Sequence, residues 1–240
     1  ERQDELVKVI RNIDWADCRF IRRKEQLRLA KSIVSAVTEE LQKYEQIILL
    51  EDDCVPQKCF FEFMFSSLEK YKEDKKVRSV CGYQLPIADF RSNSVDGVLI
   101  RRFMPWGWAT WRDRWNDYDV NLERIVNLMR NHDIFDNIPH DLKRYSLDKD
   151  IINGKNDIWS THWVLLHYLT ETYALLPSIS LIENIGFDGT GVHCVETSAF
   201  KIKKIQNEKR AINLNPEITL NDAYDKKVQE YLEIHSQNIM

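Results

Sequence analysis

The chain has 240 residues, a size that fits one large domain or a domain with a small appendage. Its residues are 43% hydrophobic and 11% aromatic, which supports a buried core and excludes a disordered chain. The net charge is −4 with acids and bases well mixed, so composition gives no case for nucleic-acid binding, which usually needs a basic face. No apolar run approaches the roughly 18 residues that can span a bilayer, and we expect no transmembrane segment.

The first 85 residues alternate between predicted helices and predicted strands. This alternation is typical of a parallel sheet covered by helices on both faces. Pro56 suits the first turn of a helix. The apolar run 47–50 is of the kind found in strands buried on both faces. The predicted elements are helices at 5–13, 24–44 and 60–71, and strands at 18–21, 47–50 and 77–81.

Regular patterning loosens after residue 87. We predict helices at 122–130 and 158–169, short strands at 173–176 and 179–182, and a last helix at 221–235. The expected organisation is a domain over 1–200 followed by a C-terminal extension over 201–240 that carries the last helix.

The five cysteines form no pattern of paired close positions, so a zinc site is not expected. Reduced thiols and a cytoplasmic protein are the better interpretation. Peripheral contact with the inner face of the membrane is left open. The cysteines are Cys18, Cys54, Cys59, Cys81 and Cys194.

The strongest functional signal is the acidic triplet Glu51, Asp52 and Asp53, directly after the apolar run 47–50. Ligands of open α/β sheets bind beyond the carboxyl ends of the strands. Adjacent carboxylates there suit a hard cation, which takes oxygen ligands from protein and substrate phosphates. Bound Mg²⁺ or Mn²⁺ would neutralise a departing diphosphate. The alternative is an acidic turn that caps the next helix.

A second candidate is Asp157, just before the helix predicted at 158–169. Its ordinary role would be to cap that helix, which is compatible with catalysis because a capping carboxylate is held rigidly. Trp159 and Trp163 lie four residues apart, on one helix face. Trp rings can stack on sugars, although packing in the core is their commoner role.

Four of the ten residues from 106 to 115 are Trp. Trp108, Trp111 and Trp115 have helical spacing, which predicts one helix face packed into the core. The pair at 106–107, Trp and Gly, could form a pocket wall where backbone approaches a ligand.

The arginines of this block, Arg112 and Arg114, are expected in solvent. Further on, three glycines follow Asn184 within a short stretch and form a flexible loop without a Walker or Rossmann fingerprint. His193, at the end of that loop, could reach a metal or a diphosphate, although a lone His is more often structural.

Three runs resemble, in order and spacing, a bacterial family of nucleotide-diphospho-sugar transferases that is similar to the N-acetylglucosaminyltransferase I type of GT-A enzyme. The runs are IILLEDDCVPQKCFFEFMFSSLEKY, WGWATWRDRW and DIWSTHWVLLHY…LLPSISLIENIGFDGTGVH. The resemblance extends from about Asp17 to His193. It implies an α/β fold of the GT-A, Rossmann-type kind, with a mostly parallel sheet flanked by helices. The match begins after the family's first strand and helix, so the implied sheet lacks that strand.

The resemblance also implies a UDP-sugar-like donor, Mn²⁺ or Mg²⁺, and a glycan or lipid-linked acceptor in surface glycan synthesis. Asp53 corresponds to the metal-binding acid, and His193 lies near the metal and the diphosphate. Glu51 and Asp52 correspond to contacts with the donor nucleotide and ribose. Arg23 is a further candidate for donor binding.

Asp157 is similar in placement to the family's general base, which takes the proton from the acceptor hydroxyl as that oxygen attacks the anomeric carbon. The implied reaction inverts the configuration of the sugar. The donor-sugar and acceptor pocket would be formed by Trp106, Gly107, Trp108 and Trp159.

Two other function classes stay open. A glycosidase would use Asp53 and Asp157 as a carboxylate pair, separated by roughly 5–9.5 Å, and would need no metal. A non-catalytic GT-A-like module would keep the fold and lack turnover. The segment 22–30 supports this last class, because it lacks the Asn and glycines common at the matching positions of the family.

Overall fold

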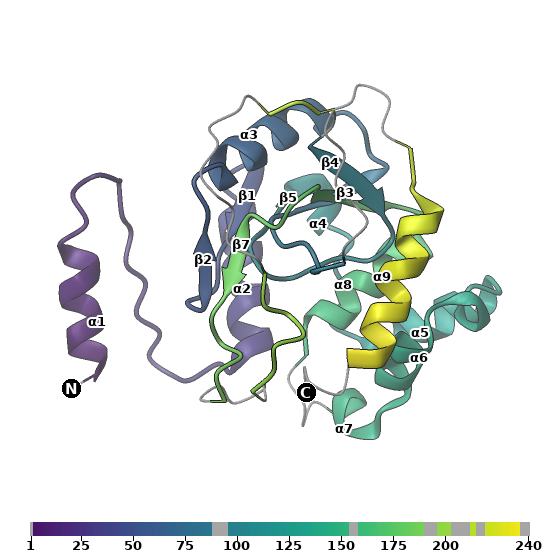
Figure 1. Ribbon diagram of the computed structural model, residues 1–240. Coiled ribbons are helices and arrows are strands. Elements are labelled where there is room, and N and C mark those ends of the chain that lie inside the picture. The colour runs from purple at the N-terminus through teal and green to yellow at the C-terminus, as the bar shows by residue number, and fades with distance from the viewer. Residues whose placement is uncertain are drawn as a thin grey trace.

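The computed structural model describes residues 2–87, 96–153, 158–189, 196–202, 212–214 and 219–235. Its architecture is mixed α/β, with a five-stranded sheet between helices and a two-stranded sheet beside it (Figure 1). The strands of the larger sheet are β1 (Gln46–Leu49), β3 (Val77–Cys81), β4 (Gly97–Ile100), β5 (Trp108–Trp111) and β6 (Tyr173–Pro177).

The strand order in this sheet is β1–β5–β3–β6–β4. Only β3 and β6 pair in parallel, and the other three neighbouring pairs are antiparallel. The expected mostly parallel sheet is therefore wrong. The reason is β5, which enters between β1 and β3 in the opposite direction and which the spacing of its Trp residues had indicated as helix.

The carboxyl ends of β1, β3 and β6 nevertheless share one edge of the sheet, because these three strands run in the same direction. β4 and β5 run the other way and begin at that edge. Trp108, the first residue of β5, pairs with Leu49 near the end of β1 and with Cys81 at the end of β3. The chain segments after β1 and before β5 are thus brought side by side.

Helices cover both faces of the sheet. Trp111 donates its indole N–H to the carbonyl of Leu68 on α3 (Phe60–Tyr71) at 3.2 Å. Trp108 points to the opposite face, because side chains alternate along a strand, and it packs against Trp163 of α8 (Ser160–Leu169). The other elements are α2 (Leu29–Leu41), β2 (Cys54–Pro56), α4 (Arg112–Trp115), α5 (Leu122–Asn131), a 3₁₀ turn (Phe135–Asn137), α6 (His140–Leu147), α7 (Lys149–Ile152), β7 (Ile182–Asn184) and α9 (Asp222–His235).

Most predicted elements are confirmed. The helix at 60–71 and the strand at 77–81 have the predicted bounds, and the helices at 122–130, 158–169 and 221–235 differ from α5, α8 and α9 only at their ends. Several expectations are wrong. Residues 18–21 form no strand, α2 begins only at Leu29, and Pro56 lies in β2 rather than in a helix. Of the strand predicted at 179–182, only Ile182 lies in a strand, β7. β1 is an edge strand with half-buried residues, not one buried on both faces.

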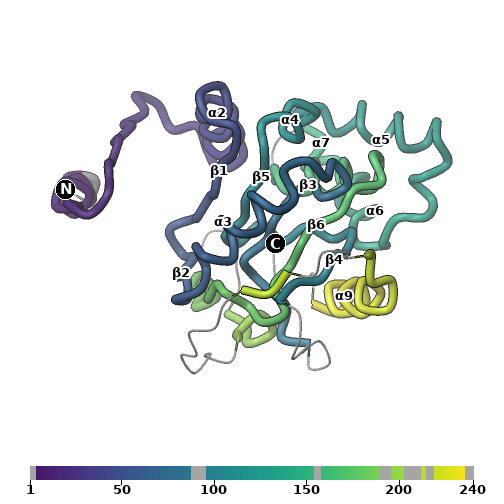
Figure 2. Tube along the Cα trace, turned by 90° about the horizontal axis from the view of Figure 1, so that it is seen from above, coloured from purple at the N-terminus to yellow at the C-terminus, as the bar shows by residue number. Residues whose placement is uncertain are grey.

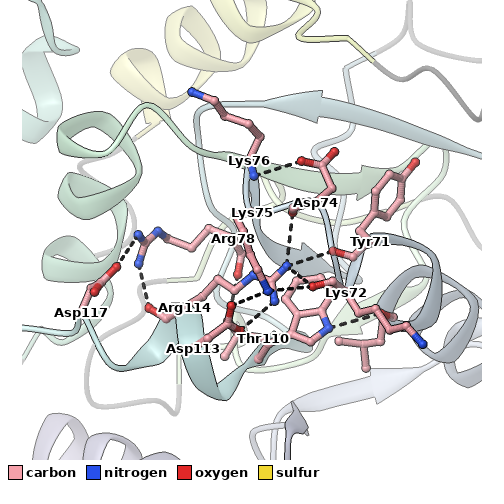
Figure 3. Close-up of polar contacts among 12 residues, drawn as sticks. Tyr71, Lys72, Asp74, Lys75, Lys76, Arg78, Thr110, Asp113, Arg114 and Asp117 are labelled. Atoms are coloured by element: carbon pink, nitrogen blue, oxygen red, sulfur yellow. Dashed lines mark hydrogen bonds and ion pairs between the residues drawn. The ribbon is translucent and has the colours of Figure 1, made fainter.

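Two buried arginines, Arg78 and Arg114, lie at the end of the sheet opposite the acidic triplet. Figure 3 shows their polar contacts. Arg114 on α4 is 4% exposed and donates to the carbonyls of Tyr71 and Lys72 at the end of α3. Arg78 on β3 pairs with Asp117 at 2.9 Å. The prediction that Arg114 is solvated is wrong, because the carbonyls at a helix end need donors that the helix does not supply.

The two ends of the described chain differ in their packing. α1 (Arg2–Arg11) stands apart from the rest, joined by an extended segment (Figures 1 and 2), and Val9 is 65% exposed. α9 lies beside β4 and α6, and contributes Tyr224, Val228 and Leu232 to the common core. The division of the chain at residue 200 stays a prediction. In the part that the structure describes, no helix is long and apolar enough to cross a membrane.

Candidate functional site

The acidic triplet lies at the carboxyl end of β1, where the sequence predicted it. Glu51 and Asp53 are half-buried, and Asp52 is exposed. The three acids do not cap the next helix, because β2 intervenes and the residue at the N-cap of α3 is Cys59. We call this group, Glu51, Asp52 and Asp53, the acid edge.

Two glycine backbones lie beside the acid edge. Gly107 has φ of 62°, a left-handed conformation that favours glycine, and an added Cβ there would lie 3.2 Å from a methyl of Leu50. Its carbonyl accepts a hydrogen bond of 2.6 Å from the N–H of Gly82, which directly follows β3. The end of β3 and the start of β5 are therefore joined by a backbone hydrogen bond. Side chains pack closely on both glycines, since an added Cβ would lie 2.4 Å from the Phe60 ring at Gly82 and 2.6 Å from Ile182 at Gly107.

The small sheet formed by β2 and β7 brings a distant segment to Asp53 (Figure 1). Cys54 pairs with Asn184, and the N–H of Ile185 donates to the backbone carbonyl of Asp53 at 2.9 Å. A Cβ on Gly186 would lie 2.5 Å from Oδ2 of Asp53, closer than real Cβ atoms approach. The Asp53 carboxylate therefore occupies its place because residue 186 is glycine.

The Asp53 carboxylate is also contacted on its other oxygen. The Cys54 thiol donates to Oδ1 at 3.5 Å. Burial, and then the negative charge of Asp53, hold the pKa of the Cys54 thiol well above its ordinary value, so the sulfur keeps its proton. Asp53 is thus positioned from two sides by neutral groups, and no cation of the protein neutralises it in these contacts.

Glu51 shows the electrostatic consequence of this crowding. Burial raises its pKa from 4.5 to about 7, and the charges of Asp53 and Asp52 add to the rise. Near neutral pH the Glu51 carboxyl is therefore about half protonated. A cation bound at the acid edge would remove the repulsion that keeps the proton there.

Trp106, expected at the wall of the pocket, is half-buried next to Gly107. Its ring makes edge-to-face contacts with Tyr83, Phe187 and Phe200, with centroids 4.5, 5.2 and 5.5 Å apart. Tyr83 follows Gly82 at the end of β3, and Phe187 follows Gly186. These four aromatic residues form a cluster that borders the acid edge on the side of Gly82 and Gly186.

Trp108 and Trp159 lie in the core instead of at a pocket wall. Trp108 is fully buried, Trp159 is 3% exposed, and their rings stack at 5.2 Å. Phe103 packs edge-to-face against both rings, and Trp163 packs against Trp108. The expectation that they contact a sugar directly is not met, because the strand β5 turns Trp108 inward toward α8.

Arg23, expected to approach the donor, lies in the segment before α2. Its guanidinium donates to the Glu39 carboxylate at 2.9 Å and to the Ser35 hydroxyl at 3.4 Å. Both partners belong to α2, so these contacts attach Arg23 to the surface of that helix and not to the acid edge.

Asp157 and His193 lie outside the described residues, and their proposed roles stay predictions. No positioning role was predicted for Asn184 and Gly186, although both stand in the stretch whose glycines and His193 were singled out. The signal that could have found them is the spacing Asn-Ile-Gly after a strand, in which an Asn side chain can hold the N–H two residues on.

Among the residues that the structure describes, no group of three or more His, Cys, Asp and Glu side chains is arranged to hold a metal ion. The acid edge offers fewer ligands than a complete protein cage. Comparison of the chain with protein-family models found no match, and no curated protein matches its sequence.

Proposed function

We propose that the chain is a metal-dependent glycosyltransferase of GT-A type, which moves a sugar from a nucleotide diphosphate donor to an acceptor hydroxyl. The observation that carries the proposal is the acid edge. Three successive carboxylates follow a strand at its carboxyl end, and burial together with the charges of Asp53 and Asp52 raises the pKa of Glu51 to about 7.

The residues fit a divalent cation that a ligand helps to hold. Mg²⁺ is usually bound through one or two carboxylates together with substrate phosphates, and Mn²⁺ also suits carboxylate ligands. Asp53, whose carboxylate is oriented by Cys54 and by the Gly186 backbone, would hold the ion. An ion there would neutralise the charge of the departing diphosphate. This arrangement agrees with the lack of a group of three ligands in the described chain.

The donor would lie across the ends of β1 and β3 and the start of β5. Glu51 and Asp52 would contact the nucleotide and its ribose. Trp106 and Gly107 would border the sugar, with the buried pair of Trp108 and Trp159 supporting this wall from behind. The acceptor would be a glycan or a lipid-linked glycan, as the resemblance implies.

Asp157 would act as the general base. It would take the proton of the acceptor hydroxyl while that oxygen attacks the anomeric carbon from the face opposite the diphosphate, which inverts the configuration. In the sequence this acid lies two residues before Trp159, which stacks on Trp108 at the start of β5.

The two acids provide the test. Asp53→Ala should abolish Mn²⁺-dependent binding of UDP in calorimetry. Asp157→Asn should keep that binding and reduce turnover of the nucleotide sugar by about 10²–10⁴-fold, as the loss of a general base does. Asp14→Ala, at an exposed position before the main fold, is the control and should change neither quantity.

Equal loss of UDP affinity in Asp53→Ala and Asp157→Asn would contradict this division of roles. The same preparations separate the other function classes. A glycosidase would keep its activity in the presence of a chelator and would need no nucleotide sugar. A non-catalytic module would bind UDP and Mn²⁺ without turnover.

A further inference from the structure

The segment between α1 and α2, residues 12–28, is exposed along most of its length. It forms neither a helix nor a strand, and it joins α1 to the rest of the fold as an extended chain (Figures 1 and 2). Every residue from 14 to 26 is exposed, and Trp15 is 83% exposed. We call residues 12–28 the linker.

Ion pairs attach the linker to the surface of α2. Arg19 pairs with Glu40, and Arg23 pairs with Glu39 at 2.9 Å. The side chains of Arg23 and Glu39 are 37% and 42% exposed. Exposed ion pairs contribute little free energy, so the linker can leave α2 without unfolding the helix.

The common core begins after the linker. In the described chain, the first residue that packs against this core is Ala30, in α2. On α1, Leu6 and Val9 are 60% and 65% exposed. Separation of α1 from the chain would therefore leave the core covered as before.

Basic residues follow one another in the middle of the linker, at Arg22, Arg23 and Lys24, and all are exposed. The exposed pair Lys226 and Lys227 has similar side chains but lies within α9, which packs into the core. A protease binds several residues of its substrate in an extended conformation. The bonds of α9 can be cleaved only after the helix opens, whereas the linker is already extended.

We infer that the linker is a proteolytic processing site, at which a protease specific for basic side chains cleaves after Arg22, Arg23 or Lys24 and releases α1 from a domain that stays folded. The reaction is hydrolysis. The C–N bond breaks as water adds across it, the carbonyl carbon takes the hydroxyl, and the nitrogen takes a proton. This inference is independent of the proposed function, because it involves no residue of the acid edge.

Limited digestion of the full chain with trypsin, followed by mass spectrometry, tests the inference. Cleavage at residues 22–24 should be faster than cleavage after Lys226 or Lys227 by about a hundredfold or more. The product that lacks α1 should keep the thermal unfolding midpoint of the undigested chain. The masses distinguish these cuts from cuts after Arg19 or Arg28.

A variant that combines Arg22→Gln, Arg23→Gln and Lys24→Gln should lose these cuts. The matched control combines Lys226→Gln with Lys227→Gln and should keep them. A protease of broad specificity should still cut the first variant within residues 12–28, because the extended conformation is retained.

Two results would overturn the inference. Similar rates of cleavage at residues 22–24 and at residues 226–227 would show that the linker is protected like a packed helix. A product that unfolds at a clearly lower temperature than the undigested chain would show that α1 belongs to the folded unit. Both are measured on the wild-type chain, so they do not depend on the folding of a variant.

Discussion

Glu51, Asp52 and Asp53 are three neighbouring acids that differ in exposure, and their difference decides what each can do. Asp52 is exposed, whereas Asp53 is fixed by the Cys54 thiol and by the backbone of residues 185 and 186. The pKa of Glu51 is raised, because its burial and the charges of Asp53 and Asp52 disfavour the ionised carboxylate. Because the charges of the metal-free acid edge destabilise it, binding of a cation there should stabilise the folded protein.

The raised pKa of Glu51 makes the stability of the metal-free protein depend on pH. The carboxyl has a pKa of about 7 in the folded chain and an ordinary pKa of 4.5, so between these pH values the folded state binds more protons than the unfolded state. The free energy of unfolding therefore falls as pH rises from 4.5 to 7 and stays lower above that window. At pH 8 the free energy of unfolding of Glu51→Gln should exceed that of the wild type by about 2–3 kcal/mol.

Urea denaturation at pH 5 and pH 8 without divalent ions measures this effect. The advantage of Glu51→Gln should be smaller at pH 5, and Glu62→Gln on the exposed side of α3 should show no comparable advantage. An advantage that is equal at both pH values would mean that the charge of Glu51 is not its source.

Gly186 predicts a second effect at this scale. Gly186→Ala should lower Mn²⁺ affinity at least tenfold, because the added Cβ displaces the Asp53 carboxylate that it would otherwise approach to 2.5 Å. Gly189→Ala is the matched control. Its φ of 82° strains an alanine by about 1–2 kcal/mol, but the nearest atom to the added Cβ is 3.6 Å away. Equal Mn²⁺ affinity in the two variants would show that Gly186 does not position Asp53.

At the scale of elements, the short helix α4 joins the ends of two longer helices. Arg112 donates from Nε to the carbonyl of Leu41 at the end of α2, and Arg114 donates to the carbonyls at the end of α3. These contacts give donors to carbonyls that have no partner within their own helix. They fix α2 and α3 to the end of β5, and so fix the register of the sheet whose other edge carries the acids.

The two arginines form a matched pair for a stability measurement. Arg114→Ala should lower the free energy of unfolding by about 3 kcal/mol, because removal of this side chain, which is 4% exposed, leaves several carbonyls without donors. Arg112→Ala should cost about 1 kcal/mol, since its side chain is 36% exposed and water can replace it. Chemical denaturation measures both, and equal losses would contradict the capping role of Arg114.

At the scale of the whole molecule, the last helix α9 packs into the common core. Its backbone is tied to β4, since the N–H of Asn221 donates to the carbonyl of Leu99 at 3.0 Å. Asp225, 1% exposed, accepts from the N–H of Arg101 at 2.9 Å and pairs with its side chain. From these contacts we expect α9 to unfold together with the rest of the core.

Val228 on α9 tests this cooperativity. Val228→Ala should lower the global free energy of unfolding by about 2 kcal/mol, because the side chain is fully buried in the common core. Ile234→Ala on the same helix, where the side chain is 72% exposed, should change it by less than about 0.5 kcal/mol. A separate low-temperature transition for α9 in calorimetry would contradict a single unit.

Features that depend on local pattern could be predicted from the sequence. The helix α3 and the strand β3 follow from periodicity, and the acids at the end of β1 follow from an apolar run that stops at Glu51. The core packing of Trp108, Trp111 and Trp115 was also indicated, since aromatic burial is a property of the residues themselves.

The direction of β5 and the approach of the segment after β7 to Asp53 were decided only by tertiary structure. Trp108 and Trp111 have spacing compatible with a helix, and pairing with β1 and β3 made them strand residues on opposite faces. The N–H of Ile185 reaches the carbonyl of Asp53 because β7, which is distant in the sequence, pairs with β2. Local sequence fixes periodicity, but the partner of a strand depends on which distant segment buries the most surface beside it, and that choice belongs to the folded chain.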